Sequence, residues 1–306
     1  MTDPVPILFD TDLGTDVDDA IALAFVARDP RCDLRGVTTV NGDTRRRAAL
    51  TQALLDLMKR DDVPIGVGAS LPIDGAKSLS MPVGIVASEP LADLPDDMPT
   101  AEDVFVEVLR DATTPVHVVG VGAFTNVASC LVAHPELHEA VAGVHLMGGC
   151  LGPYRLVPGG GQHPAKPEFN LNGDPIAAAV CLGLPLRLRL APYEVTNELM
   201  FTDDELAAIA AAGELGAALD VQMTGWLDLL RGSPDPDVPR VRLHDPLTVV
   251  GIVDPAVETI GTVHLSVRGR AGDAYLVESP AGRPVEVIRS ADSDSLRRQL
   301  LAAITG

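Results

Sequence analysis

Five aspartates lie in one short stretch near the start of the sequence, DTDLGTDVDD at residues 10–19. Carboxylates held this close repel one another, so at least one pKa should rise unless a cation lies between them. Aspartate at a helix start also satisfies free N–H groups, which would explain one or two of the five. Oxygen ligands without a nearby cysteine favour Ca²⁺ or Mg²⁺. The stretch therefore predicts helix capping, a hard-cation site, or both.

Two later segments carry polar residues that could complete such a site. Asp245 follows His244 in LHDPL, just before a helical pattern. It is either a distant metal ligand or a helix cap followed by proline. Glu168, Asn170 and Asn172 alternate in PEFNLNG. In an extended segment they would face one side and suit a polyhydroxylated ligand such as a sugar; a solvated loop is the alternative.

Short apolar runs that alternate with helical patterns would have to position these residues. The predicted strands are 5–9, 34–40, 63–69, 116–122, 141–149, 184–191 and a final pair at 260–267 and 274–278. The predicted helices are 18–28, 44–59, 101–111, 126–133, 174–182, 203–231, 247–253 and 291–304, with loops at 70–100 and 150–167. This order predicts an α/β fold: one domain over 1–306 with an open, mostly parallel (mixed) sheet flanked by helices. Ligands of such sheets bind beyond the carboxyl ends of the strands.

Bulk properties narrow the possible partners. The formal net charge is −20 over 306 residues, which argues against nucleic acid, because binding it requires a basic surface. No apolar run approaches the roughly 20 residues of a membrane span, and no signal peptide opens the chain. The four cysteines are widely spaced, so neither a zinc ribbon nor a redox motif is predicted. We expect a cytoplasmic protein with no membrane partner.

Taken together, the motifs resemble those of the inosine-uridine preferring nucleoside hydrolase family. The opening resembles the family signature D-x-D-x-G-x-D-D-A. Further similarities are TTVNGD to T-T-V-x-G-N, VGAFTNVA to G-x-L-T-N-[IV]-A, HLMGG to L-M-G-G, PEFNLNGDPIAA to A-E-F-N-x-x-x-D-P-E-A-A, and HDP to the late H-D-P. The matches run in family order from residue 7 to about 255. The resemblance implies a Rossmann-like fold and hydrolysis of ribonucleosides to free base and ribose.

The resemblance also implies a role for each matching position, with Ca²⁺ as cofactor. The implied metal ligands are Asp12, Asp19, Asp245 and the backbone carbonyl of Val121. The implied ribose contacts are Asp18, Asp43, Gln162, Glu168 and Asn170, and the implied supporting residue is Asp10, beside which we place Asp16. Asp12 would activate the attacking water, and His244 would protonate the leaving base. This agrees with an oxocarbenium-like transition state, which negative groups stabilise. The resemblance suggests a homodimer or homotetramer.

The sequence departs from the family pattern at several places. Thr15-Asp16-Val17 stands where the signature has one residue, so the acid turn is two residues longer and Asp16 is an extra acid that could itself be a ligand. Asp43 and Gln162 replace asparagines, and the loop 70–100 lacks the usual H-G segment. The alternatives are therefore a hydrolase of another N-glycoside, modified or non-ribosyl, and a calcium- and ribosyl-binding member without turnover.

Overall fold

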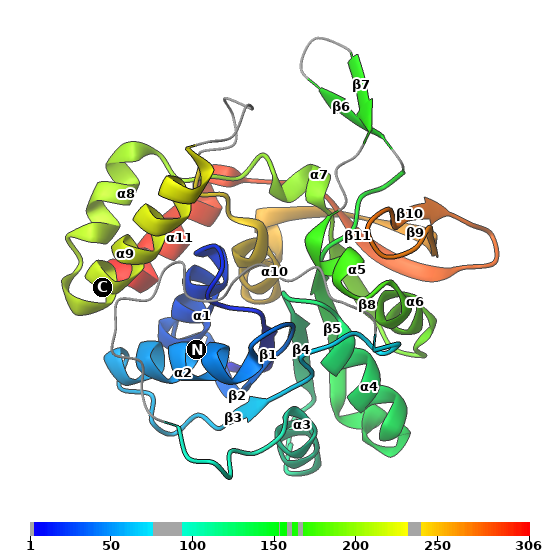
Figure 1. The fold of residues 1–306 in the computed structure, drawn as a ribbon, viewed down its shortest axis with the longest axis horizontal. Coiled ribbons are helices and arrows are strands. Elements are labelled where there is room, and N and C mark those ends of the chain that lie inside the picture. Colours follow the sequence, from blue (N-terminus) through cyan, green and yellow to red (C-terminus); the bar gives the residue numbers. More distant parts are fainter. Residues whose placement is uncertain (1–2, 76–93, 153, 158–160, 165–167, 232–239) are drawn as a thin grey trace.

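A nine-stranded sheet forms the centre of the protein in the computed structural model, which describes residues 3–75, 94–152, 154–157, 161–164, 168–231 and 240–306 (Figure 1). Its strand order is β10 (Tyr275–Glu278), β9 (Glu258–Arg268), β11 (Arg283–Ala291), β8 (Leu188–Ala191), β5 (Val141–Met147), β4 (Val116–Gly120), β1 (Val5–Thr11), β2 (Cys32–Thr39) and β3 (Ile65–Val67). All neighbours are parallel except at β9, which is antiparallel to β11 and β10. The predicted mixed, mostly parallel sheet is confirmed.

Helices pack on both faces of this sheet (Figure 1). One apolar core includes residues of α1 (Asp18–Arg28), α2 (Thr44–Leu57), α8 (Asp203–Ala210), α9 (Gly213–Leu230), α10 (His244–Val253) and α11 (Ser293–Thr305). The other includes residues of α3 (Ala101–Arg110), α4 (Thr125–Ala133) and α6 (Pro175–Gly183). Along β1, Ile7 and Phe9 face the first core and Leu8 the second. A strand covered on both sides reads as a continuous apolar run, as this one does.

The chain order places one reversal of strand order at the centre of the sheet. From β1 the chain builds β2 and β3 on one side and then returns to add β4 on the other side of β1. The order therefore reverses between β1 and β4, and open α/β sheets bind ligands at such a point, outside the carboxyl ends of the strands. The acid turn follows β1, and Val121 follows β4, so both lie at this point.

Several predicted elements were wrong in detail. β11 was missed, and a hairpin of β6 (Tyr154–Val157) and β7 (Gly161–Pro164) lies within the predicted loop 150–167. The segment from Glu168 is not extended but forms the short helix α5 (Phe169–Gly173). The predicted helix 203–231 divides into α8 and α9. Within the described residues, no helix combines the length and apolar character needed to cross a bilayer.

Candidate active site

The acid turn begins at the end of β1 and leads directly into α1. Gly14 has φ +111°, a conformation that costs side-chain-bearing residues energy. Val17, whose side chain cannot cap a helix, occupies the N-cap position of α1, and Asp18 and Asp19 lie in the first helical turn. None of the turn's aspartates is therefore the N-cap residue. The negative charges do lie at the positive end of the helix dipole, which favours them.

Asp10 lies behind the acid turn, and its hydrogen bonds link the ends of neighbouring strands. It is fully buried, and its Oδ1 accepts hydrogen bonds from Thr38 Oγ1 at 2.5 Å and Asn126 Nδ2 at 2.7 Å. Burial raises the pKa of Asp10 to about 7. Its contacts thus connect β1 to β2 and to the first turn of α4, in keeping with the supporting role that the resemblance implies.

Three carboxylates converge at the start of α1. One oxygen each of Asp16, Asp18 and Asp19 lies within 4.8 Å of the others. Burial, followed by repulsion from neighbouring aspartates, raises the pKa of Asp18 and Asp19 well above the usual value, and raises that of Asp16 to about 6. These acids are hard to ionise together, and a divalent cation would remove that difficulty.

Asp245, which is far from the acid turn in the sequence, lies next to this cluster of carboxylates. It lies buried in the first turn of α10, and its backbone N–H donates to Asp18 Oδ2 at 3.3 Å. Leu243 is the N-cap residue of α10, so Asp245 is not the helix cap. Burial and the charges of Asp18 and Asp19 raise the pKa of Asp245 well above its usual value.

The donor set fits a hard cation. Within the described chain, Asp18 Oδ1 is buried and has no hydrogen-bond partner, an arrangement that costs free energy unless another ligand satisfies it. The Thr11 hydroxyl accepts from the Leu13 N–H at 3.1 Å and donates to Asp19 Oδ1, which fixes this carboxylate. A converging all-oxygen set with a carboxylate oriented from behind suits Ca²⁺ or Mg²⁺.

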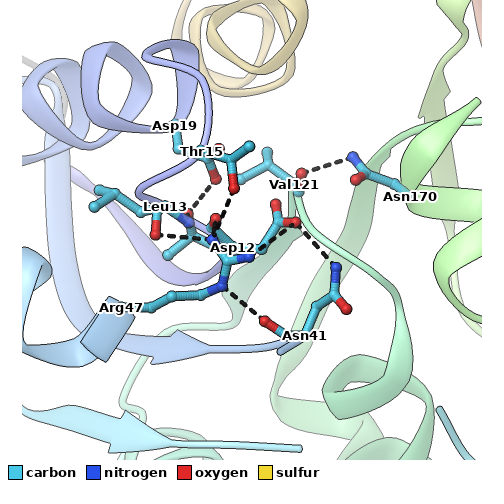
Figure 2. A network of polar contacts seen from close by, with 9 residues as sticks. Asp12, Leu13, Thr15, Asp19, Asn41, Arg47, Val121 and Asn170 are labelled. Carbon is cyan, nitrogen blue, oxygen red and sulfur yellow. Dashed lines mark hydrogen bonds and ion pairs between the residues drawn. The ribbon is translucent and has the colours of Figure 1, made fainter. Parts of the chain in front are cut away.

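Asp12 has different neighbours from the other acids of the turn (Figure 2). Its side chain is 13% exposed, its Oδ2 accepts from Asn41 Nδ2 at 3.3 Å, and Arg47 Nη2 lies 4.0 Å from the same oxygen. Burial raises the pKa of Asp12, while Arg47 and Asn41 lower it. The charge of Arg47 and the hydrogen bond from Asn41 therefore offset part of the cost of burial, but the net shift of the Asp12 pKa is upward.

The second turn, after β2, uses different residues from those expected. Asp43 is exposed and caps α2 by accepting from the Arg46 N–H at 3.1 Å. Asn41, two residues earlier, is buried and faces Asp12 from a left-handed backbone conformation with φ +68°. Sequence reasoning missed Asn41, although asparagine before glycine is typical of residues that adopt this conformation.

The side of the site opposite the acid turn is formed by Val121, Glu168 and Asn170. Asn170 Nδ2 donates to the Val121 carbonyl at 2.7 Å, as Figure 2 shows, and to the Met147 carbonyl at 3.1 Å. Glu168 is the N-cap of α5 and accepts from three backbone N–H groups, those of Gly149, Asn170 and Leu171. This capping explains why the segment forms a helix rather than the extended chain we expected.

His244 lies beside Asp245 under an aromatic ring. Its Nδ1 is 2.9 Å from Thr196 Oγ1, and its ring stacks on Tyr193 with centroids 5.6 Å apart and planes at 18°. Burial, aided by Arg242, lowers the pKa of His244 to about 4. The imidazole is therefore neutral at pH 7.

Two parts of the expected site lie outside the described residues. Gln162 belongs to β7, but its side chain is not among those described, and neither are residues 76–93 of the loop 70–100. The structure brings Asp12, Asp18, Asp19 and Asp245 to one place together with Asp16. It also adds Arg47, which no sequence motif singled out.

Comparisons with known proteins show the family to which this chain belongs. The family model described as inosine-uridine preferring nucleoside hydrolase matches residues 7–298. The pyrimidine-specific ribonucleoside hydrolase of Salmonella newport is 30% identical over 264 residues, which cover 83% of this chain and 81% of that protein. The corresponding enzyme of Photobacterium profundum is 29% identical over 260 residues, with 82% and 80% covered.

Solved structures show the same fold. A plant nucleoside hydrolase superposes with a TM-score of 0.85 at 22% identity, covering 99% of both chains. The purine-preferring ribonucleoside hydrolase from Gardnerella vaginalis has a TM-score of 0.84 at 22% identity, covering 98% of both. From the match of the family model over nearly its whole length, the chain belongs to the inosine-uridine preferring nucleoside hydrolase family and is a glycosidase of that family.

Proposed function

We propose that this protein hydrolyses the N-glycosidic bond of ribonucleosides in a calcium-dependent reaction that gives free base and ribose. The observation that carries the proposal is the meeting of Asp12, Asp18, Asp19 and Asp245 at the point between β1 and β4 where the strand order reverses. Four such acids gathered at one point fit a cation site, and an oxocarbenium-like sugar would gain from their charge.

The residues assigned to the cation are those that the resemblance to the family implies. Asp12, Asp19, Asp245 and the Val121 carbonyl would hold Ca²⁺. Because a carbonyl oxygen has two lone pairs, the Asn170 hydrogen bond to Val121 leaves one for a metal. Asp16 is a further candidate ligand, since its carboxylate lies within reach of Asp18 and Asp19. When bound, the cation would lower the pKa of the attacking water and offset carboxylate repulsion.

Asp12 is the residue that we assign as general base. Water attacks C1′ of the ribose, the new C–O bond forms as the C1′–N bond breaks, and Asp12 takes one water proton. The bonding electron pair leaves with the nucleobase. Asp18, Glu168 and Asn170 would bind ribose hydroxyls, while Asp43 and Gln162 remain predictions from the resemblance.

His244 is the residue that we assign to the leaving base. A hydrogen bond donated by Thr196 to Nδ1 would place the ring proton on Nε2, from which the ring can donate a hydrogen bond to a base nitrogen, while the departing base takes its proton from solvent. Because the ring is neutral, it would act as an N–H donor rather than as an imidazolium.

The test is product analysis with a nucleoside panel. Uridine, cytidine, inosine and adenosine, with 2′-deoxy and base-modified analogues, are incubated with the purified protein and Ca²⁺. We expect release of free base and reducing sugar from at least one ribonucleoside. Cleavage of the analogues alone would favour the other N-glycosides. Calcium binding without cleavage of any compound would favour a member without turnover.

A further inference from the structure

Arg47 has an unusual environment for a charged side chain. It lies in the first turns of α2 and is fully buried. A buried guanidinium is normally paired with a hydrogen-bonded carboxylate, because an unpaired buried charge costs several kcal/mol. Among the described residues, however, its hydrogen-bond acceptors are backbone carbonyls and one hydroxyl, and the ion-pair contact is to Asp12 Oδ2 at 4.0 Å.

The contacts of Arg47 join the two turns that face each other across the ends of β1 and β2. Nε donates to the Asn41 carbonyl at 2.7 Å in the second turn. Nη1 donates to the carbonyls of Asp12 and Leu13, the latter at 3.0 Å, and approaches Thr15 Oγ1 at 3.4 Å. Figure 2 shows the guanidinium between Asn41 and the acid turn. Three of its acceptors thus belong to the lengthened turn itself.

These contacts require the shape of arginine as well as its charge. The guanidinium is a rigid planar fork with five donors, whereas a lysine ammonium is a compact point charge on a flexible stem. A lysine at this position would keep the charge near Asp12 but has a single nitrogen in place of Nε and Nη1, which contact the Asn41 carbonyl and the carbonyls of Asp12 and Leu13 respectively. The longer turn loses more backbone conformational entropy when it is ordered, so hydrogen bonds from α2 help to hold it in one conformation.

We infer that Arg47 is a positioning residue, which fixes the lengthened acid turn and so aims the Asp12 carboxylate at the cation and the attacking water. The inference rests on the proposed function for the role of Asp12. It does not require that Arg47 contact the substrate. Residues that orient a metal ligand in this way typically change metal affinity or activity 10- to 100-fold when replaced.

The test is calcium binding to the metal-stripped protein, measured by isothermal titration calorimetry. Arg47→Lys and Arg47→Gln should both weaken Ca²⁺ binding by at least about 10-fold. The matched control is Arg45→Gln. Arg45 lies on the same helix with a side chain 45% exposed and donates to the carbonyls of Leu94 and Pro95, so its loss should change the affinity by less than about two-fold.

The possible outcomes distinguish an effect of the geometry of the Arg47 side chain from an effect of its charge. Wild-type affinity in Arg47→Lys would show that charge alone suffices and would overturn the inference. Tighter binding in Arg47→Gln would show that Arg47 merely repels the cation, which also overturns it. Unfolding of both variants in EDTA, judged by near-UV circular dichroism, would make Arg47 a general structural residue instead. Failure of the wild-type protein to bind Ca²⁺ would contradict the calcium dependence in the proposed function.

A second readout follows the reaction. Under the proposed function, Arg47→Lys should lower kcat about 10- to 100-fold at saturating Ca²⁺ while KM for the nucleoside changes less than about three-fold. Asp12 acts on water rather than on the ground-state sugar, so its misplacement affects the transition state most. An unchanged kcat with a raised KM would place Arg47 in substrate binding and overturn the inference.

Discussion

Asp12 is distinguished from the other acids by its two nitrogen-bearing neighbours, Asn41 and Arg47. Asp10 instead accepts from Thr38 and Asn126 and lies behind the site. This contrast assigns different tasks to two aspartates that are only two positions apart on β1 and its following turn. A base needs access to water and an affinity for its proton. Asp12 is partly exposed, and burial raises its pKa although Arg47 and Asn41 lower it.

Asp12→Asn tests this assignment, because it keeps the size of the side chain and removes its basicity. We expect kcat to fall by roughly 10²- to 10⁴-fold. The free energy of unfolding in EDTA should stay the same or rise, since one repelling carboxylate is lost. Steady-state kinetics and urea unfolding measure the two effects. The control is Asp56→Asn, an exposed change on α2. Substantial activity in Asp12→Asn would show that another group is the base.

The residues of the site could be predicted only where a motif named them. Asp12, Asp18, Asp19 and Asp245 were found in this way and do converge. Arg47 was hidden in the run Arg45-Arg46-Arg47, since only the helical phase of α2 decides which arginine is buried. Asn41 was passed over in favour of Asp43 because the backbone turn that selects between them is a tertiary feature.

At the scale of elements, α5 shows how a local pattern was misread. Alternating polar residues in Glu168–Asn172 suggested an extended segment, but a five-residue helix is too short to show helical periodicity. The deciding contact is the cap by Glu168, which includes Gly149 from a separate loop. β11 was missed for a related reason. Its buried Val285 and Val287 flank Glu286, which pairs with Arg187 and Arg189, so its apolar run is interrupted.

Glu168→Ala tests the role of this cap in stability. Three backbone N–H groups would lose their acceptor, so we expect the free energy of unfolding to fall by about 2 kcal/mol. Urea unfolding of the calcium-free protein, without nucleoside, isolates this effect from ribose binding. Glu107→Ala, an exposed glutamate on α3, is the control. Unchanged stability in Glu168→Ala would mean that the residue serves the ligand alone.

At the scale of the whole molecule, the point where the strand order reverses is also the place where the buried carboxylates gather. The sheet brings the turns after β1, β2 and β4 together because β1 lies between β2 and β4. The alternation of strands and helices predicted a mostly parallel sheet but not this strand order. We expect the resulting concentration of carboxylates to make the protein's stability depend on both protons and cations.

The pH dependence of stability follows from the raised pKa values. The pKa of Asp16 is raised to about 6 and that of Asp10 to about 7, both from 3.8. With these raised pKa values, the folded metal-free protein binds protons more tightly than the unfolded chain does. The two groups therefore stabilise the folded state below pH 4, and this contribution is lost as pH rises from about 4 to about 7. We therefore expect the unfolding temperature in EDTA to fall across this window relative to Asp10→Asn and Asp16→Asn variants.

Calcium should oppose this loss. A ligand present at 100 times its Kd stabilises the folded state by about 2.7 kcal/mol, and binding strengthens as the carboxylates ionise. The difference in unfolding temperature between calcium and EDTA should therefore grow from pH 5 to pH 8. A difference that shrinks with rising pH would contradict a carboxylate cation site.

The most direct test of the central claim is nucleoside hydrolysis as a function of free Ca²⁺. Metal-stripped protein is titrated with Ca²⁺ while release of reducing sugar from the best ribonucleoside of the panel is followed. We predict no turnover in EDTA and recovery with half-saturation equal to the Kd from calorimetry. We also predict loss of both signals in Asp19→Asn. Full turnover in EDTA, or half-saturation unrelated to binding at this turn, would contradict the account.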